Sequence, residues 1–146
     1  TIHIVSNVNE GGYDMYQSIT NRFAFGTYIA ENAGYTYTST STQNQDIDIN
    51  SKYSISGSYD GQTMKLRTSN GEMKATTYQA MAVAGTIGKP TNNTYMVLGA
   101  NPTGSQAESG EQFFDGEISS VRIYNRALSD EENAVNYLND RERYNL

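Results

Sequence analysis

Two pairs of acidic residues are spaced so that both members lie on one face of an extended strand. They are Asp46 with Asp48, and Asp115 with Glu117. Two carboxylates roughly 5 Å apart can act as acid and nucleophile on a glycosidic bond. A strand that carries this chemistry as E-x-D-x-x-E needs a third acid, but position 120 is Ser and no third acid follows the first pair. Both pairs therefore predict solvated strand ends or turn ligands.

His3 is the single histidine and stands between Ile2 and Ile4 in a strand-like segment. A Ser-His-Asp site would have to be built around it, yet the chain contains no G-x-S-x-G nucleophile turn. One histidine and no cysteine exclude a metal cluster built from these residue types. We therefore expect His3 to be an outward-facing strand residue, and we expect the protein not to be an enzyme.

Calcium is the metal ion that the composition suits best, because it prefers oxygen ligands from Asp, Glu, Asn and backbone carbonyls. The loops of a β-protein can supply such ligands. Asn101, Asp115 and Glu117 are the candidates for a structural Ca²⁺ site. The chain has no D-x-[DN]-x-[DN]-G loop, so the prediction rests on residue type alone.

Sugar recognition needs flat aromatic rings against C–H groups and short polar side chains against hydroxyl groups. The chain is rich in both and contains twelve Tyr. In GYTYTSTSTQNQ, which begins at Gly34, alternation places Tyr35 and Tyr37 on one strand face and the Thr residues on the other. Tyr35 and Tyr37 are the candidate ligand-binding residues. Two other interpretations stay open, namely an edge that pairs with a partner and an ordinary exposed strand.

Length and charge limit the class of protein. The 146 residues suit one domain with one hydrophobic core. The formal net charge is -6 and the basic residues are not clustered, so we expect no nucleic acid partner. No apolar run approaches the roughly 18 residues of a membrane span, so we expect no membrane insertion. The absence of Cys leaves the redox compartment open.

Apolar residues two positions apart predict at least six short strands. The pairs are Ile2/Ile4, Tyr13/Met15, Phe23/Phe25, Tyr53/Ile55, Met64/Leu66 and Met96/Leu98. The turn sequences Asp60-Gly61 and Asn70-Gly71 predict a three-stranded antiparallel meander over residues 52–78. Residues 100–112 predict a long polar loop. Because half-buried strands must cover their apolar faces, the pattern predicts an all-β sandwich of two antiparallel sheets.

One helix is predicted, from Ser129 to about Tyr144. Ser129 and Glu132 form an S-x-x-E capping box, which satisfies free N–H groups of the first turn. Three apolar residues are expected to cover a sheet edge, and they are Ala134, Val135 and Leu138. The polar side is expected to face water, and it comprises Asn133, Asn136, Asn139 and residues 140–143.

Three blocks in order resemble laminin-G-like, concanavalin A-like jelly-roll domains. They are SYDGQTMKLRTSNGE, MVLGANP and FFDGEISSVRIYNRALSDEE, within about Ser54 to Tyr144. The tail NYLNDRERYNL is similar to endings of such domains in bacterial surface and bacteriophage proteins. The resemblance implies a jelly-roll sandwich with a short C-terminal helix, and related domains often carry calcium. It also implies a late strand within residues 113–129, whose core residues would be Ile118, Val121 and Ile123.

Two departures from the family pattern concern the chain start and the helix. The usual upstream strand, F-D-G-x-x-D-x-V, is not found, which suggests a truncated or unusually short domain. An apolar residue usually stands where this chain has Asn133, which suggests a helix that is docked less firmly. We therefore interpret residues 1–146 as a single laminin-G-like domain that lacks an N-terminal strand.

The resemblance and the composition together favour a noncatalytic carbohydrate-binding or adhesive module. Its setting would be extracellular, on a cell surface or in a virion, and its partner would be a glycan. The alternative is a structural or assembly module, such as a phage decoration or a surface-protein spacer, which binds neighbouring protein. A glycoside hydrolase-like enzyme comes third, because the carboxylate pattern is missing.

Overall fold

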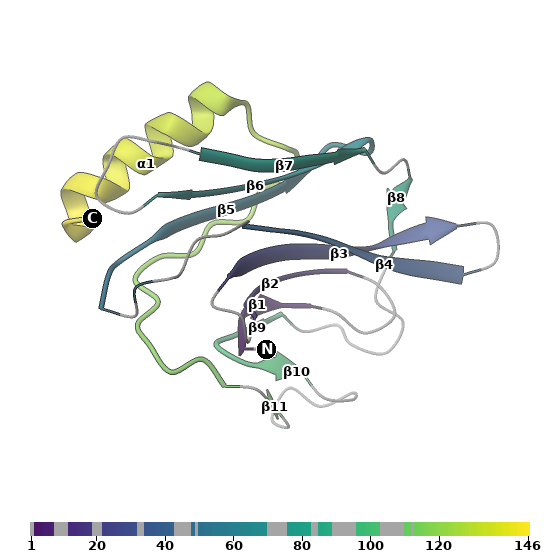
Figure 1. Ribbon diagram of the computed structural model, residues 1–146, viewed down its shortest axis with the longest axis horizontal. Coiled ribbons are helices and arrows are strands. Elements are labelled where there is room, and N and C mark those ends of the chain that lie inside the picture. The colour runs from purple at the N-terminus through teal and green to yellow at the C-terminus, as the bar shows by residue number, and fades with distance from the viewer. Residues whose placement is uncertain are drawn as a thin grey trace.

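The computed structural model describes residues 2–7, 12–18, 22–31, 34–42, 48, 50–69, 76–82, 85–88, 96–102, 110–111 and 113–146. Figure 1 shows two stacked sheets, with one helix on the outer side of the smaller sheet. The predicted all-β sandwich with a C-terminal helix is confirmed. Within these residues, no helix has the length and apolarity to span a membrane.

The larger sheet has six strands in the order β4-β3-β2-β1-β9, and β8 also pairs with β3. Their bounds are β1 Ile2–Ser6, β2 Tyr13–Gln17, β3 Phe23–Glu31, β4 Gly34–Ser41, β8 Thr86–Ile87 and β9 Val97–Leu98. All pairings are antiparallel. The register between β3 and β4 is unbroken from Ala24↔Ser41 to Glu31↔Gly34.

The smaller sheet confirms the predicted meander. It consists of β5 Ser54–Tyr59, β6 Thr63–Ser69 and β7 Thr76–Ala82, all antiparallel. The first turn forms because the Asp60 carboxylate accepts from the N–H groups of Gln62 and Thr63, at 2.9 and 2.6 Å. The predicted Asn70-Gly71 turn lies outside the described residues. Two further short strands, β10 Asn101–Pro102 and β11 Gly110–Glu111, form a separate pair at the two ends of the predicted polar loop.

The core lies between the two sheets. Its buried residues come from β1, β3 and β6, and they are Ile4, Phe23, Phe25, Met64 and Leu66. Gly57 on β5 allows the sheets to approach closely, because a Cβ at this position would overlap the Phe25 ring. The alternating pattern seen in the sequence therefore marks the faces that meet.

The helix α1, Asp130–Tyr144, begins as predicted. The Ser129 hydroxyl accepts from the Glu132 N–H at 3.2 Å, and the Glu132 carboxylate accepts from the Ser129 N–H at 2.9 Å. At the same end, Arg67 from β6 pairs with Asp130. These contacts join the first turn of the helix to the smaller sheet.

The predicted orientation of α1 is wrong. Asn133 was expected to face water, but it is only 8% exposed, whereas Val135 is 57% exposed and does not cover a sheet edge. Asn133 Oδ1 accepts from Ser56 Oγ at 2.7 Å, and Asn133 Nδ2 donates to the Ser129 carbonyl at 2.8 Å. The outer face of β5 carries Ser residues, so an amide satisfies this contact better than an apolar side chain would. Tyr137 is the other buried residue of the helix.

The late strand implied by the resemblance is also absent, since residues 113–129 contain no strand. Figure 1 shows this stretch running from beside β11, past both sheets, to the start of α1. Phe114 and Ile118 pack against the core, but Ile123 is 50% exposed. The spacing explains why the strand prediction is wrong. Strand alternation would place Ile118 and Ile123 on opposite faces, so a strand could not turn both toward the core.

Candidate functional site

The outer face of the larger sheet, which is turned away from the smaller sheet, carries aromatic and polar side chains that contact one another across three strands. Asp14 on β2, Gly26 on β3 and Ser39 on β4 are in register across the three strands. Because Phe25 on β3 points into the core, alternation turns Gly26 and the residues beside it outward. Tyr37 on β4 belongs to the same outer face.

Tyr37 reaches across β3 to contact Asp14 on the strand beyond. Its hydroxyl donates to Asp14 Oδ1 at 2.8 Å. The ring passes over Gly26, where a Cβ would overlap the Tyr37 hydroxyl and lie 2.7 Å from Asp14 Oδ1. The contact therefore depends on a glycine at position 26, which leaves a gap in an otherwise regular strand.

Gly12, next to the first residue of β2, fixes the position of that strand against β3. It adopts a positive φ of 80° and donates its N–H to the Gly88 carbonyl at 2.6 Å. Its own carbonyl accepts from Thr27 Oγ1 at 2.7 Å and from the Tyr28 N–H at 3.1 Å. Because these bonds hold the two strands in register, Asp14 is placed opposite Gly26.

Burial dominates the electrostatics of Asp14. The residue is 2% exposed, and burial raises the pKa of its carboxyl from 3.8 to about 6, although the hydrogen bond from Tyr37 acts in the opposite direction. Burial, and then the nearby Asp14 charge, raise the pKa of Tyr37 well above its ordinary value. The tyrosine therefore keeps its proton and remains the donor in this pair.

Further hydroxyl and aromatic groups surround the Asp14–Tyr37 pair. The rings of Tyr28 and Tyr37 are tilted by 60°, with their centroids 5.1 Å apart. Tyr16 donates to Ser39 Oγ at 3.4 Å. Tyr37 is 37% exposed, and the other three side chains are half-buried. We call Asp14, Tyr16, Tyr28, Tyr37 and Ser39 the tyrosine face.

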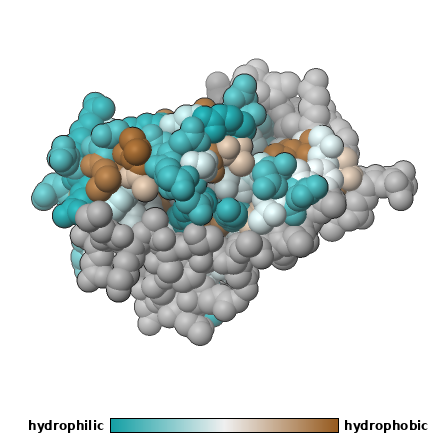
Figure 2. Space-filling model, turned by 90° about the horizontal axis from the view of Figure 1, so that it is seen from above, coloured by the Kyte–Doolittle hydropathy of each residue, from teal (hydrophilic) through white to brown (hydrophobic). Residues whose placement is uncertain are grey.

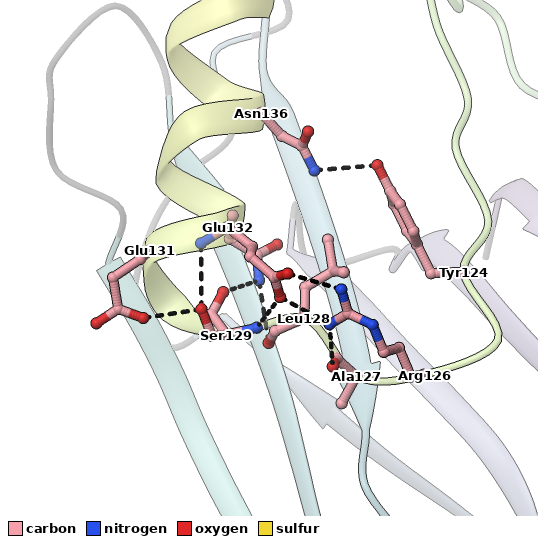
Figure 3. A network of polar contacts seen from close by, with 9 residues as sticks. Tyr124, Arg126, Ala127, Leu128, Ser129, Glu131, Glu132 and Asn136 are labelled. Atoms are coloured by element: carbon pink, nitrogen blue, oxygen red, sulfur yellow. Dashed lines mark hydrogen bonds and ion pairs between the residues drawn. The ribbon is translucent and has the colours of Figure 1, made fainter.

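A second location is the hollow beside α1, which has a volume of about 320 Å³. Its lining residues are Tyr124, Arg126, Leu128, Glu131, Glu132, Val135 and Asn136. Figure 3 shows how its polar groups contact one another. Arg126 donates to both carboxylate oxygens of Glu132, at 2.7 and 2.6 Å, and Asn136 Nδ2 donates to the Tyr124 hydroxyl at 3.1 Å.

These contacts give the hollow a structural role. The Arg126 pair holds the pKa of the Glu132 carboxyl at about 2, below its ordinary 4.5, and the same carboxylate caps the helix at Ser129. Figure 2 shows this helical side of the molecule, where a few apolar side chains stand among mostly hydrophilic ones. Since Glu132 of the hollow caps α1, whereas the tyrosine face holds a buried acid with a raised pKa, the tyrosine face is the better candidate for ligand binding.

The predicted ligand-binding pair is described only in part. Tyr37 lies on the tyrosine face, and the backbone places Tyr35 on the same strand, but the Tyr35 side chain is outside the described residues. The His3 side chain is outside them as well. The proposed roles of these residues stay predictions.

The three predicted calcium ligands lie on two segments, Asn101 on β10 and the two acids within residues 113–129. Asn101 begins β10, and its Oδ1 accepts from Ser6 Oγ at 3.4 Å. Asp115 and Glu117 are exposed, and Glu117 accepts from Ser119 Oγ at 3.1 Å. In the described part of the chain, no three His, Cys, Asp or Glu side chains form a metal-ligating group. The calcium site also stays a prediction.

Sequence reasoning missed Asp14, Tyr16 and Tyr28. The pattern of Tyr13 and Met15 predicted the strand correctly, and the residue between them received no role. The available signal was an aspartate at the second position of the strand sequence YDMYQ, because aspartate is depleted in strands. An acid at such a position indicates either an exposed face or a specific partner.

Comparison with protein-family models matches residues 1–133 to the family described as the concanavalin A-like lectin/glucanases superfamily. The matched segment includes the whole larger sheet, the smaller sheet and the first residues of α1. Searches of curated proteins and of solved structures gave no significant match.

Proposed function

The chain belongs to the concanavalin A-like lectin/glucanase superfamily, and from this premise we propose that it is a noncatalytic module that binds glycans through its tyrosine face. Membership supports a carbohydrate-binding or adhesive module at the level of the superfamily. The glycan, the ligand face and the setting in a secreted, cell-surface or virion protein are parts of the proposal.

The observation that carries the proposal is the buried Asp14 carboxylate behind a partly exposed tyrosine. Burying a carboxylate costs stability, and perturbed acids of this kind cluster at functional sites. Because the Tyr37 hydroxyl donates its hydrogen bond to Asp14, the lone pairs of the Tyr37 oxygen can accept from a sugar hydroxyl. The Tyr28 and Tyr37 rings supply surface for C–H groups. A preorganised group of this kind binds with a smaller entropic cost.

The same face supports binding without turnover. The glycosidase mechanism uses two carboxylates, one on each side of the scissile bond. Among the described side chains of the tyrosine face, Asp14 is the single acid, and its burial keeps it behind Tyr37. We therefore assign Asp14 a positioning role.

A glycan array tests the proposal. The wild-type protein is expected to bind a defined set of glycans saturably, and Tyr37→Ala is expected to weaken binding about tenfold or more, because it removes both a ring and a hydroxyl. Tyr35→Ala tests the neighbouring strand position. Tyr124→Ala is the matched control, since Tyr124 is an exposed tyrosine beside α1 and should leave binding unchanged. A blank array, or equal losses for Tyr37→Ala and Tyr124→Ala, would contradict the proposal.

Calcium binding is a separate proposal for Asn101, Asp115 and Glu117, whose oxygen donors suit this ion chemically. Titration of metal-free protein with Ca²⁺ is expected to raise its melting temperature, with a Kd on the order of 10⁻⁴ to 10⁻³ M, as in extracellular modules. Asp115→Asn should remove this response, whereas Asp60→Asn, in the turn between β5 and β6, should keep it. A melting temperature that does not respond to millimolar Ca²⁺ would show that the assignment is wrong.

An assembly module that binds neighbouring protein is the second candidate function. The observation that favours it is β4, which lies at one edge of the larger sheet in the described part of the chain. An exposed strand edge can pair with a strand of another molecule. Stable assembly together with a blank glycan array would favour this function.

A further inference from the structure

The tyrosine face presents three kinds of group that attract a positive charge. They are the π faces of Tyr28 and Tyr37, the Tyr37 oxygen and the carboxylate of Asp14. A protonated amine is a cation with three N–H donors and no acceptor, whereas a sugar hydroxyl is neutral and both donates and accepts. The arrangement of these groups therefore discriminates between sugars by their charge.

The two rings form a surface on which an ammonium group can lie. The centroids of Tyr28 and Tyr37 are 5.1 Å apart, and the rings are tilted by 60° to each other. A cation is attracted to the face of an aromatic ring when it lies within about 6 Å of the ring centroid. Because the two centroids are closer together than this, one ammonium group can lie within reach of both rings.

The hydroxyl of Tyr37 is oriented as an acceptor toward a ligand. It donates its hydrogen bond to Asp14 Oδ1 at 2.8 Å. Burial, and then the Asp14 charge, raise its pKa well above the ordinary value, so the hydroxyl keeps its proton. With that proton directed at Asp14, the Tyr37 oxygen can accept from a ligand but does not donate to it. An ammonium group, which only donates, suits this oxygen better than a carboxylate or a sulfate, which only accepts.

The charges around the face favour a cation as well. Burial raises the pKa of the Asp14 carboxyl to about 6, so this group is mostly ionised at neutral pH. Within the described part of the chain, the strands of the larger sheet contain no Lys or Arg. By contrast, β6 of the smaller sheet carries Lys65 and Arg67, which pair with Asp130. A cation at the tyrosine face therefore lies near a negative charge and is not repelled by a basic side chain of these strands.

We propose that the glycan bound by the tyrosine face carries free amino groups, as in a glucosamine polymer whose nitrogens are not acetylated. The ammonium group of one sugar lies over the Tyr28 and Tyr37 rings and donates to the Tyr37 oxygen, while the Asp14 carboxylate behind Tyr37 supplies the compensating charge. N-acetylation would remove the positive charge and leave one N–H donor. This inference rests on the proposed glycan binding and adds the charge of the ligand to it.

A matched pair of ligands tests the proposal in the wild-type protein. Isothermal titration calorimetry at about pH 6.5 compares a glucosamine oligosaccharide with its fully N-acetylated form of equal length. Asp14 is mostly ionised at this pH. We expect the amine form to bind about tenfold or more tightly than the acetylated form, because the cation–π contacts and the Asp14 charge act on the amine form alone. Equal affinities, or tighter binding of the acetylated form, would overturn the proposal.

Asp60→Asn is the matched control for net charge. The protein has a formal net charge of -6, so it attracts any polycation nonspecifically. Asp14→Asn and Asp60→Asn each remove one negative charge, but Asp60 lies in the turn between β5 and β6 of the smaller sheet. Asp14→Asn should lower the ratio of the two affinities about threefold or more, whereas Asp60→Asn should keep it. Equal decreases would show nonspecific attraction and would also overturn the proposal.

The outcomes separate this inference from the proposed function. If the array shows glycan binding that depends on Tyr37, but the amine form has no advantage over the acetylated form, the inference is wrong and the proposed function stands. A blank array contradicts the proposed function itself. An oligolysine peptide of similar charge decides the class of ligand. If it binds as tightly as the amine oligosaccharide, the assignment to a glycan is wrong and a basic protein partner is favoured.

Discussion

Asp14→Asn is expected to stabilise the protein at pH 8 and to leave its stability at pH 4 nearly unchanged. The amide is close to the carboxylate in shape, and its oxygen can still accept from Tyr37, but it carries no charge to bury. Because burial raises the pKa of Asp14 from 3.8 to about 6, the gain at pH 8 corresponds to about 3 kcal/mol of free energy of unfolding.

The direction of this effect follows from proton binding. Between pH 3.8 and about 6 the folded Asp14 keeps its proton while the unfolded chain has lost it, so the stability that Asp14 contributes falls as pH rises through this window. Above the window both states are ionised and the penalty is constant. Urea unfolding of wild type and Asp14→Asn from pH 4 to 8 measures the difference directly.

Asp60→Asn serves as the control with the opposite sign. Hydrogen bonds from the Thr63 and Gln62 N–H groups lower the pKa of Asp60, so its contribution to stability is lost as pH falls. Both variants should therefore diverge from wild type as pH rises, Asp14→Asn toward higher stability and Asp60→Asn toward lower stability. If Asp14→Asn follows the wild-type curve at every pH, or is the less stable protein at pH 8, the account of Asp14 is incorrect.

Gly26→Ala is expected to destabilise the protein by about 2 to 6 kcal/mol and to abolish glycan binding. The new Cβ would overlap the Tyr37 hydroxyl and approach Asp14 Oδ1 to 2.7 Å, so the tyrosine must move away. The overlap costs about 1 to 3 kcal/mol, and the loss of the Tyr37 hydrogen bond to the buried Asp14 carboxylate costs about 1 to 3 kcal/mol more. Urea unfolding measures the loss of stability, and the glycan array measures the loss of binding.

A double-mutant cycle with Tyr37→Ala separates this mechanism from a general effect on β3. When the tyrosine ring is absent, most of the overlap disappears, so Gly26→Ala should cost less in that background than in wild type. If the two losses of stability are additive, Gly26 instead stabilises β3 independently of Tyr37. If Gly26→Ala binds glycans as strongly as the wild type does, the contact between Tyr37 and Asp14 is not required for binding.

The sequence predicted the features whose cause is local. Asp60 forms its turn with N–H groups two and three residues away, and Ser129 caps a helix with Glu132 three residues away. Alternation also identified the faces of β3 and β6 that form the core, because its period of two residues is a property of any strand. These interactions favour the same local structure in an isolated segment and in the folded chain.

Two features of the fold could not be obtained in this way, since each depends on a partner distant in the chain. Asn133 is buried because Ser56, 77 residues earlier, offers a hydroxyl to it. Residues 113–129 resemble a strand, yet Phe114 and Ile118 pack against the core whereas Ile123 is exposed. The turn at Asp60 would form whatever segment packs beside it. The face that α1 buries and the course of residues 113–129 depend instead on the surfaces around them.

For the candidate site, alternation along the chain predicted Tyr35 and Tyr37 on one strand face, and the folded structure shows which residues lie beside Tyr37. Tyr37 and Asp14 are 23 residues apart, and no pattern along the chain relates them. They meet because three strands align in one register and Gly26, on the middle strand, has no side chain to separate them. Burial is the main cause of the raised pKa of Asp14, and burial is a property of the folded molecule.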